Sequence, residues 1–287
     1  MAELIPGEYD VTLNGVHIHY TVQGSGPVMI AHSGGPGMDA RGWDDFGKID
    51  EFVTIVSMHP RGSGLSGPAT GDAYLLPDYA ADAEALRVHL GLEKPIVMGW
   101  SHGGMVAMQF AFTYPDSLSK LILVDTSAYF GEFLSDIEGA VQEFKNEPWF
   151  EKSFAALKAE WAGEYNTDEE MARLWIEEMK FYFKHFDERA EAYRESTKDL
   201  PVRIAPLKTF NEKEAATMDL RPHLKKITIP TLVIVGRHDF ITNVAMAEEI
   251  AKHIHNARLE IFEESGHYPL IEESEKFYRV IKEFVES

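Results

Sequence analysis

The sequence predicts an α/β protein with a mostly parallel central sheet, helices on both faces of that sheet and a helical insertion. Short apolar runs alternate with longer helical patterns, which is typical of parallel strands that are buried on both faces. One stretch, residues 128–223, breaks this alternation and contains no convincing strand. The length of 287 residues suits one large domain that carries an insertion.

The N-terminal segment predicts a β-hairpin. Residues 11–13 and 16–20 flank Asn14-Gly15, a dipeptide that supplies the two positive φ angles of a tight turn. Six apolar runs then predict six further strands, at residues 27–31, 52–58, 95–99, 118–125, 230–236 and 258–262.

Helical spacing of apolar residues predicts the helices between these strands. They are expected at residues 78–90, 105–114, 243–253 and 272–285. Gly91 follows the first helix and Pro115 follows the second, and both residue types end helices. The alternation of strands and helices predicts that all strand C-termini after the hairpin meet at one edge of the sheet.

Residues 128–223, which interrupt the alternation of strands and helices, are rich in aromatic and acidic residues. Residues 128–223 hold 16 of the 33 aromatic residues and carry a net charge of −8. Amphipathic patterns predict helices near residues 137–144, 154–161 and 170–183. We therefore expect a core formed by residues 1–127 and 224–287, with residues 128–223 as a helical cap.

Composition excludes several functions. The absence of cysteine excludes a disulfide scaffold, a thiolate nucleophile and cysteine-bound zinc. The net charge of −20 disfavours nucleic acid and anionic membrane surfaces as partners. No apolar stretch reaches the ~18 residues of a membrane span, and the N-terminus shows no signal-peptide pattern. We expect a cytoplasmic protein with a small-molecule substrate, and the oligomeric state stays open.

One motif predicts a nucleophile. Residues 99–103 read Gly-Trp-Ser-His-Gly, a G-x-S-x-G pattern with an apolar strand before it and an apolar helix after it. Such a tight turn needs small residues at Gly99 and Gly103, and it projects the hydroxyl of Ser101 above the sheet edge. Ser101 is therefore the expected nucleophile.

A serine nucleophile needs a base and an orienting acid. His267 follows the last expected strand and precedes the last helix, so it lies at the same sheet edge as Ser101. Asp239 follows the strand at 230–236, and Asp125 ends an earlier strand as a rival for the acid. The order Ser101, Asp239, His267 favours Asp239.

These residues resemble the α/β-hydrolase fold family over nearly the whole chain. Gly-Gly-Pro-Gly at residues 34–37 and Arg-Gly-Ser-Gly-Leu-Ser at residues 61–66 are similar to segments of the proline iminopeptidase group within that family. The resemblance implies an oxyanion hole formed by the backbone N–H groups of Gly35 and His102. Glycine at residue 35 would let the backbone approach a ligand closely.

The substrate is less sharply predicted. Some iminopeptidases have a glutamate directly after the catalytic aspartate, and here that position is Phe240. Glu212, with Glu214 as the next choice, matches the glutamate that binds the substrate amine from the cap. Together with Trp100, beside the nucleophile, Glu212 and Phe240 are the candidate substrate-binding residues.

The sequence thus predicts a serine hydrolase that cleaves an ester, lactone or amide of a small substrate through an acyl-enzyme, with a preference for neutral esters or lactones. A proline iminopeptidase-like aminopeptidase is the alternative enzyme, and a hydrolase-fold receptor for a small ligand is the alternative outside catalysis. No cofactor or metal is expected. His17-x-His19 places two imidazoles on one strand face, but no third ligand is identifiable.

Overall fold

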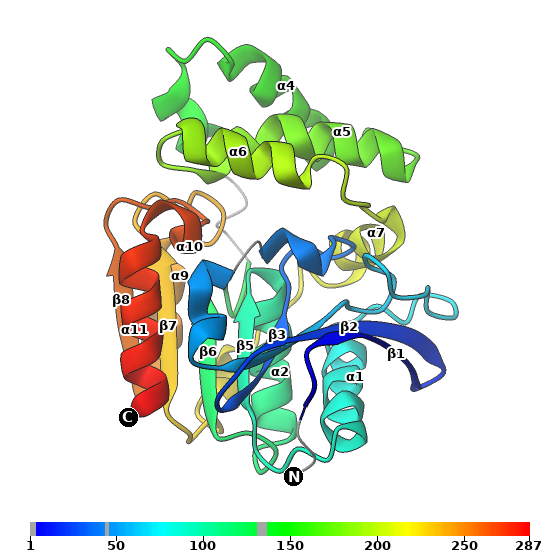
Figure 1. Ribbon diagram of the computed structural model, residues 1–287. Coiled ribbons are helices and arrows are strands. Elements are labelled where there is room, and N and C mark those ends of the chain that lie inside the picture. The colour runs from blue at the N-terminus through cyan, green and yellow to red at the C-terminus, as the bar shows by residue number, and fades with distance from the viewer. Residues whose placement is uncertain (1–3, 44–45, 131–136) are drawn as a thin grey trace.

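The computed structural model describes residues 4–43, 46–130 and 137–287. Its centre is an eight-stranded sheet with the order β1-β2-β4-β3-β5-β6-β7-β8 (Figure 1). The strands are β1 (Gly7–Leu13), β2 (Val16–Gly24), β3 (Val28–His32), β4 (Thr54–Met58), β5 (Ile96–Trp100), β6 (Lys120–Val124), β7 (Thr231–Gly236) and β8 (Ala257–Phe262). The two pairs that involve β2 are antiparallel and all other pairs are parallel, which confirms the mostly parallel sheet.

The hairpin forms where the sequence predicts it. Strands β1 and β2 pair from Gly7 opposite Val22 to Leu13 opposite Val16. The two turn residues, Asn14 and Gly15, have φ angles of 49° and 79°. Asparagine and glycine tolerate this left-handed conformation best, so the local sequence fixes the turn.

Alternate side chains of the parallel strands build two separate cores. Ile30 and Val97 face one side, where helices α1, α2 and α9 pack. Met29 and Met98 face the other side, where α11 and two short 3₁₀ segments pack. The bounds are α1 (Leu76–His89), α2 (His102–Thr113), α9 (Val244–His253), α11 (Ser274–Glu286), η1 (Ala40–Trp43) and η2 (Phe46–Glu51). Because the strands are buried on both faces, functional groups are confined to the sheet edges.

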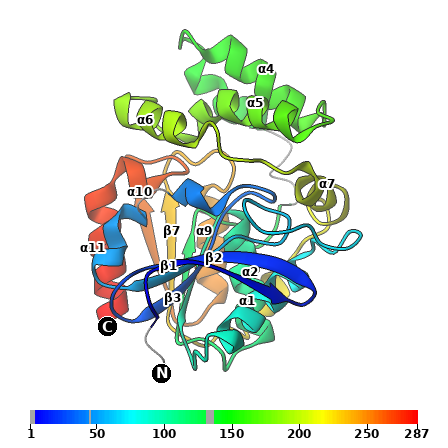
Figure 2. The same cartoon turned by 45° about the vertical axis from the view of Figure 1, so that its right-hand side comes forward.

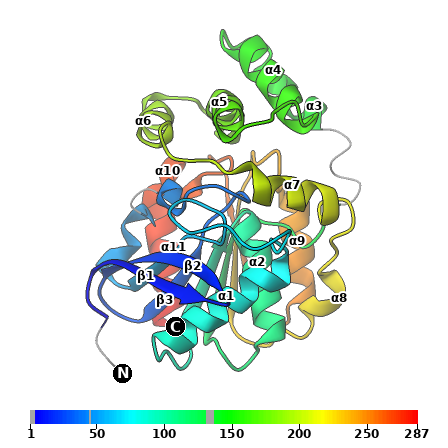
Figure 3. The same cartoon turned by 90° about the vertical axis from the view of Figure 1, so that its right-hand side faces the viewer.

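A second set of helices covers the edge at which the parallel strands end. Figures 1 and 2 show α4, α5 and α6 in a layer beyond this edge, and Figure 3 shows α7 between that layer and the sheet. The elements are α3 (Ile137–Ala140), η4 (Val141–Phe144), α4 (Phe150–Trp161), α5 (Asp168–Glu178), η5 (Met179–Tyr182), α6 (Glu188–Thr197) and α7 (Ile204–Lys213). The short helices α8 (Arg221–Leu224) and α10 (Pro269–Glu272) complete the fold.

The structure refines one helix that the sequence predicts in this segment. The helix expected at residues 170–183 ends at Glu178 and continues as the 3₁₀ turn η5. Residues 131–136 of the expected cap lie outside the described residues. None of the helices that the structure describes is long and apolar enough to cross a membrane.

Candidate active site

Ser101 sits in a strained turn between β5 and α2. Its backbone has φ 54° and ψ −123°, a conformation that residues other than glycine rarely adopt. A Cβ on Gly103 would lie 2.1 Å from the carbonyl oxygen of His32, and one on Gly99 would lie 2.1 Å from that of Gly103. The turn therefore requires both glycines, as the motif predicts. The backbone N–H of Ser101 donates to the carbonyl of Val124 at 2.9 Å, and this hydrogen bond anchors the turn to β6.

The loops after β7 and β8 bring Asp239 and His267 together. His267 Nδ1 lies 2.7 Å from Asp239 Oδ2, and both side chains are buried. Thr242 supports the carboxylate, since its hydroxyl donates to Oδ2 at 2.6 Å and its N–H donates to Oδ1 at 3.0 Å. Burial opposes ionisation of Asp239, but His267 and these donors outweigh it and lower the pKa of the carboxyl. The group is therefore a carboxylate, the form that can orient an imidazole.

His267 is also held through its backbone. Its N–H donates to the carbonyl of Tyr182 in η5 at 2.7 Å, and its own carbonyl accepts from the indole N–H of Trp100 at 3.1 Å. The ring of Tyr182 packs edge-on against the imidazole, with 5.4 Å between ring centroids. The residue expected as the base is thus fixed by the sheet and by the helical segment together.

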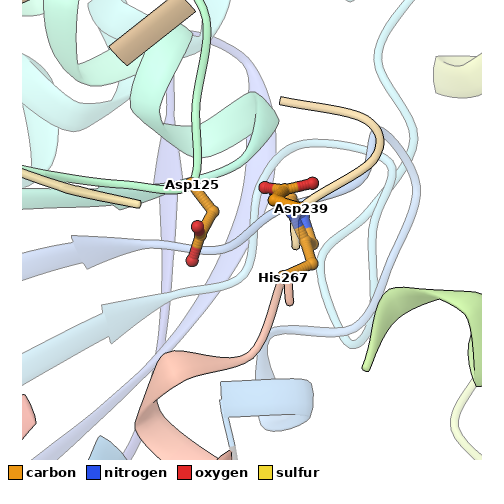
Figure 4. Close-up of side chains that lie close together, drawn as sticks. All are labelled: Asp125, Asp239 and His267. Atoms are coloured by element: carbon orange, nitrogen blue, oxygen red, sulfur yellow. Dashed lines mark hydrogen bonds and ion pairs between the residues drawn. The ribbon is translucent and has the colours of Figure 1, made fainter. Parts of the chain in front are cut away.

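Asp125, the alternative candidate for the acid, directly follows β6 and lies close to Asp239 and His267. Figure 4 shows Asp125, Asp239 and His267 approaching one another from three separate segments. Each contributes one nitrogen or oxygen atom, and these three atoms lie within 4.8 Å of one another. The hydrogen bond from His267 goes to Asp239, whereas Asp125 Oδ1 accepts the backbone N–H of Gly236 at 2.8 Å. Burial, followed by the nearby Asp239, raises the pKa of Asp125 well above its ordinary value.

The two expected oxyanion donors flank Ser101. A Cβ on Gly34 would lie 2.9 Å from Ser101 Cβ, so the loop after β3 passes directly beside the nucleophile turn. Gly35 has φ +64° and lines the same pocket as Ser101 and His102. The imidazole of His102 is buried, and burial followed by the nearby His32 lowers its pKa to about 3. The histidine is therefore neutral, and its backbone N–H stands at the N-terminus of α2.

A cavity of about 370 Å³ lies between the sheet edge and the helical segment. Ser101, His267 and Trp100 line it from the sheet side. Aromatic side chains of the helical segment line it from the other side; they include Trp161, Trp175, Tyr182 and Phe210. This mostly apolar wall matches the aromatic content of residues 128–223 and is typical of small-molecule pockets.

Two expected substrate-binding residues lie elsewhere. Glu212 is exposed near the end of α7 and is not among the described residues that line the cavity, because Leu207, Phe210 and Asn211 occupy the side of the helix that faces it. Phe240 is buried against the ring of Tyr182, at 4.9 Å between centroids, and so supports the wall from behind. Glu214, the second choice, accepts the N–H of Leu76 at 3.0 Å and is likewise not among those lining residues.

Two carboxyl groups of the helical segment that the sequence analysis did not single out do line the cavity. Glu178 is buried and its Oε2 has no hydrogen-bond partner in the described part of the chain. Glu160 lies near it, and burial raises the pKa of Glu160 to about 7. Burial, followed by Glu160, raises the pKa of Glu178 well above its ordinary value. The helical spacing contained a clue, because Met171, Trp175 and Glu178 follow one another at intervals of four and three and so share one face of α5.

Comparison with known proteins identifies the family. Residues 27–274 match the family described as alpha/beta hydrolase fold. The chain belongs to this family. It is 28% identical to a proline iminopeptidase of Saccharolobus solfataricus, over 95% of this chain and 90% of that protein. It is 25% identical to the human serine hydrolase BPHL, over 96% of this chain and 85% of the relative.

The solved structures agree on the fold. The enol-lactonase of Burkholderia xenovorans superposes with a TM-score of 0.74 at 21% identity, covering 97% of this chain and all of the lactonase. The expected α/β-hydrolase fold and the similarity to iminopeptidases are therefore confirmed. The relatives are named hydrolases, which also confirms the expectation of a hydrolytic enzyme that acts on small substrates.

Proposed function

We propose that this α/β-hydrolase is a serine hydrolase that cleaves an ester, lactone or amide bond of a small substrate through an acyl-enzyme on Ser101. The observation that carries the proposal is the 2.7 Å contact between His267 and Asp239, in the same site as a serine on a glycine-lined elbow. This is the combination of nucleophile, base and orienting acid that acyl transfer requires.

The mechanism follows from these positions. His267 accepts the proton of Ser101 as Oγ attacks the carbonyl carbon, and Asp239 stabilises the imidazolium that forms. The N–H groups of Gly35 and His102 would stabilise the oxyanion of the tetrahedral intermediate. His267 then protonates the leaving group, and the acyl-enzyme remains. Water, deprotonated by His267, attacks the acyl-enzyme and releases the acid and free Ser101.

Covalent labelling tests the proposal directly. A fluorophosphonate probe should modify Ser101, and a p-nitrophenyl ester should give a burst of one p-nitrophenol per enzyme followed by steady turnover when deacylation is slow. Label on another serine would contradict the assignment of the nucleophile. Ligand binding without label or turnover would favour the receptor alternative.

We further propose that residues 128–223 act as the cap that sets substrate size, and that the enzyme works in the cytoplasm. The aromatic side chains of this segment on the cavity wall support the first point. An apolar wall accommodates an uncharged acyl chain, which favours neutral esters or lactones. The raised pKa values of Glu160 and Glu178 fit this preference, because neutral carboxyl groups hydrogen-bond to uncharged polar groups.

The same two residues favour a second candidate, an aminopeptidase that binds a substrate with a free amine. A bound ammonium group would pair with Glu178 and would draw its pKa back towards the ordinary range. The test compares kcat/KM for a proline arylamide, a p-nitrophenyl ester and a homoserine lactone, in the parent and in Glu178→Gln. If the arylamide is the best substrate and Glu178→Gln impairs only that reaction, the aminopeptidase is correct. The matched control is Glu212→Gln, since Glu212 is exposed.

A further inference from the structure

The carboxyl group of Asp125 is unusually placed for a residue outside the proposed triad. It is fully buried, its Oδ1 accepts from Gly236, and its Oδ2 has no hydrogen-bond donor in the described part of the chain. One carboxyl oxygen of Asp239 lies within 4.8 Å of a carboxyl oxygen of Asp125. Its backbone has φ 42°, so the chain holds this side chain at the end of β6 in a conformation that is uncommon for residues other than glycine.

Two carboxylates cannot hydrogen-bond to each other, because both only accept. A hydrogen bond between these two neighbouring groups therefore requires a proton on one of them. Asp239 accepts from His267, Thr242 and Ile241, and each of these bonds favours its ionised form. Asp125 has a single donor, so the proton belongs on Asp125.

We propose that Asp125 is a positioning residue that stays protonated and donates a hydrogen bond to Asp239, and thereby sets how strongly Asp239 stabilises the imidazolium of His267. The proposal rests on the proposed triad. The charged or titratable groups that face Asp125 are Asp239 from the loop after β7, His267 from the loop after β8 and Glu272 from α10. The acids among them oppose a negative charge on Asp125, in agreement with the direction of its pKa shift.

The test is the acid limb of kcat/KM against pH, measured on the substrate that the parent turns over best. In Asp125→Ala the donor is lost, Asp239 interacts more strongly with His267, and the acid limb should move up by about one pH unit. Asp125→Asn retains an N–H donor of the same size and should return the acid limb to within about 0.3 unit of the parent. Thermal unfolding of each variant reports separately on its fold.

An ionised Asp125 would give the opposite result. Both variants would then remove a negative charge from beside His267, and both acid limbs would move down, which overturns the proposal. Equal acid limbs in all three proteins overturn it as well. If Asp125→Ala does not fold, Asp125→Leu, which also lacks a donor, takes its place with the same expected rise. A lowered acid limb in Asp125→Asn refutes the proposal in either case. Asp239→Asn distinguishes failure of the Asp125 proposal from failure of the proposed triad, because full activity in that variant would refute the triad itself.

Discussion

The indole N–H of Trp100 donates a hydrogen bond to the backbone carbonyl of His267 at 3.1 Å. The residue directly before the proposed nucleophile therefore holds the residue proposed as the base, although 167 positions separate them in the chain. Their rings also pack, with 5.3 Å between centroids. Trp100 thus has a positional role in addition to its place on the cavity wall.

Trp100→Phe should lower kcat about tenfold, because it leaves the buried carbonyl of His267 without this donor and loosens the base. KM should change less than kcat. Steady-state kinetics on a p-nitrophenyl ester give both values, and Trp161→Phe at the more exposed part of the cavity serves as the comparison. A rise in KM at constant kcat would assign Trp100 to substrate binding alone.

Ser101→Ala should lower kcat by about 10⁴-fold or more, as loss of the nucleophile does in other triads. The fold should be retained, since the change removes one hydroxyl group that lines a cavity. Turnover of an activated ester and the melting temperature check the two expectations. Activity near that of the parent would show that acyl transfer does not proceed through Ser101.

Asp239→Asn should lower kcat by about 10⁴-fold, because the amide favours the wrong tautomer of His267 while it keeps the local geometry. Steady-state rates at neutral pH measure this loss. The comparison with Asp125→Asn tests the choice of acid, and the Asp125 variant should lose far less. The reverse ranking would place the orienting acid at the end of β6.

Gly103→Ala should destabilise the protein by about 1–3 kcal/mol or more, because its Cβ would overlap the carbonyl oxygens of His32 and Ser33. Displacement of the turn should also slow fluorophosphonate labelling of Ser101. Gly42→Ala is the matched control, since the one contact that its Cβ would make within 4 Å in the described part of the chain is with the Tyr193 hydroxyl, at an ordinary 3.6 Å. Urea unfolding of the two variants should give clearly different midpoints, and equal midpoints would count against the strict requirement for glycine.

Glu178→Gln should stabilise the protein increasingly as pH rises. The folded-state pKa of Glu178 lies above its ordinary value of 4.5, so above that pH the unfolded chain releases its proton first and stability falls. Glutamine does not titrate, so the difference in Tm between variant and parent should widen from pH 5 to pH 8. Each kcal/mol of difference in the free energy of unfolding corresponds to about 2–4 °C in Tm.

The adjacent Glu177 provides a control of opposite sign. Burial opposes ionisation of Glu177, but ion pairs with Lys152 and Lys180 outweigh it and lower the pKa of this carboxyl. The ionised Glu177 therefore stabilises the fold at neutral pH, and this contribution is lost as pH falls through the lowered pKa. Glu177→Gln should therefore lower Tm at neutral pH. A constant gap for Glu178→Gln across the pH range would mean that folding does not raise the pKa of Glu178.

The sequence predicted the groups whose position depends on strand ends. Ser101, Asp239 and His267 each follow a parallel strand, and the C-termini of such strands share one edge. Asp125 follows a strand by the same rule, so strand ends alone do not choose between the two acids. The hydrogen bond from His267 to Asp239 agrees with the choice made from residue order.

The cavity wall contributed by the helices was harder to predict. A helical pattern predicts which face of a helix is apolar. It does not predict whether that face lines the cavity or packs against other helices of the insertion. Glu212 carries the expected chemistry on an exposed position, whereas Glu178 is hidden in an apolar stripe that normally indicates core packing. A carboxyl group inside such a stripe, as at Glu178, is the feature to search for in related sequences.

The hydrogen bond from the N–H of His267 to the carbonyl of Tyr182 means that the helical segment helps to hold the proposed base in place. The acceptor is a main-chain atom, so in principle any residue type at position 182 supplies it, provided that the backbone follows the same path. Side chains around the cavity can therefore diversify during evolution while the base keeps its support. A deletion that shifts the backbone in η5 would cost activity on every substrate, whereas substitution of an exposed cavity-lining side chain such as Trp161 would mainly change which substrates are preferred.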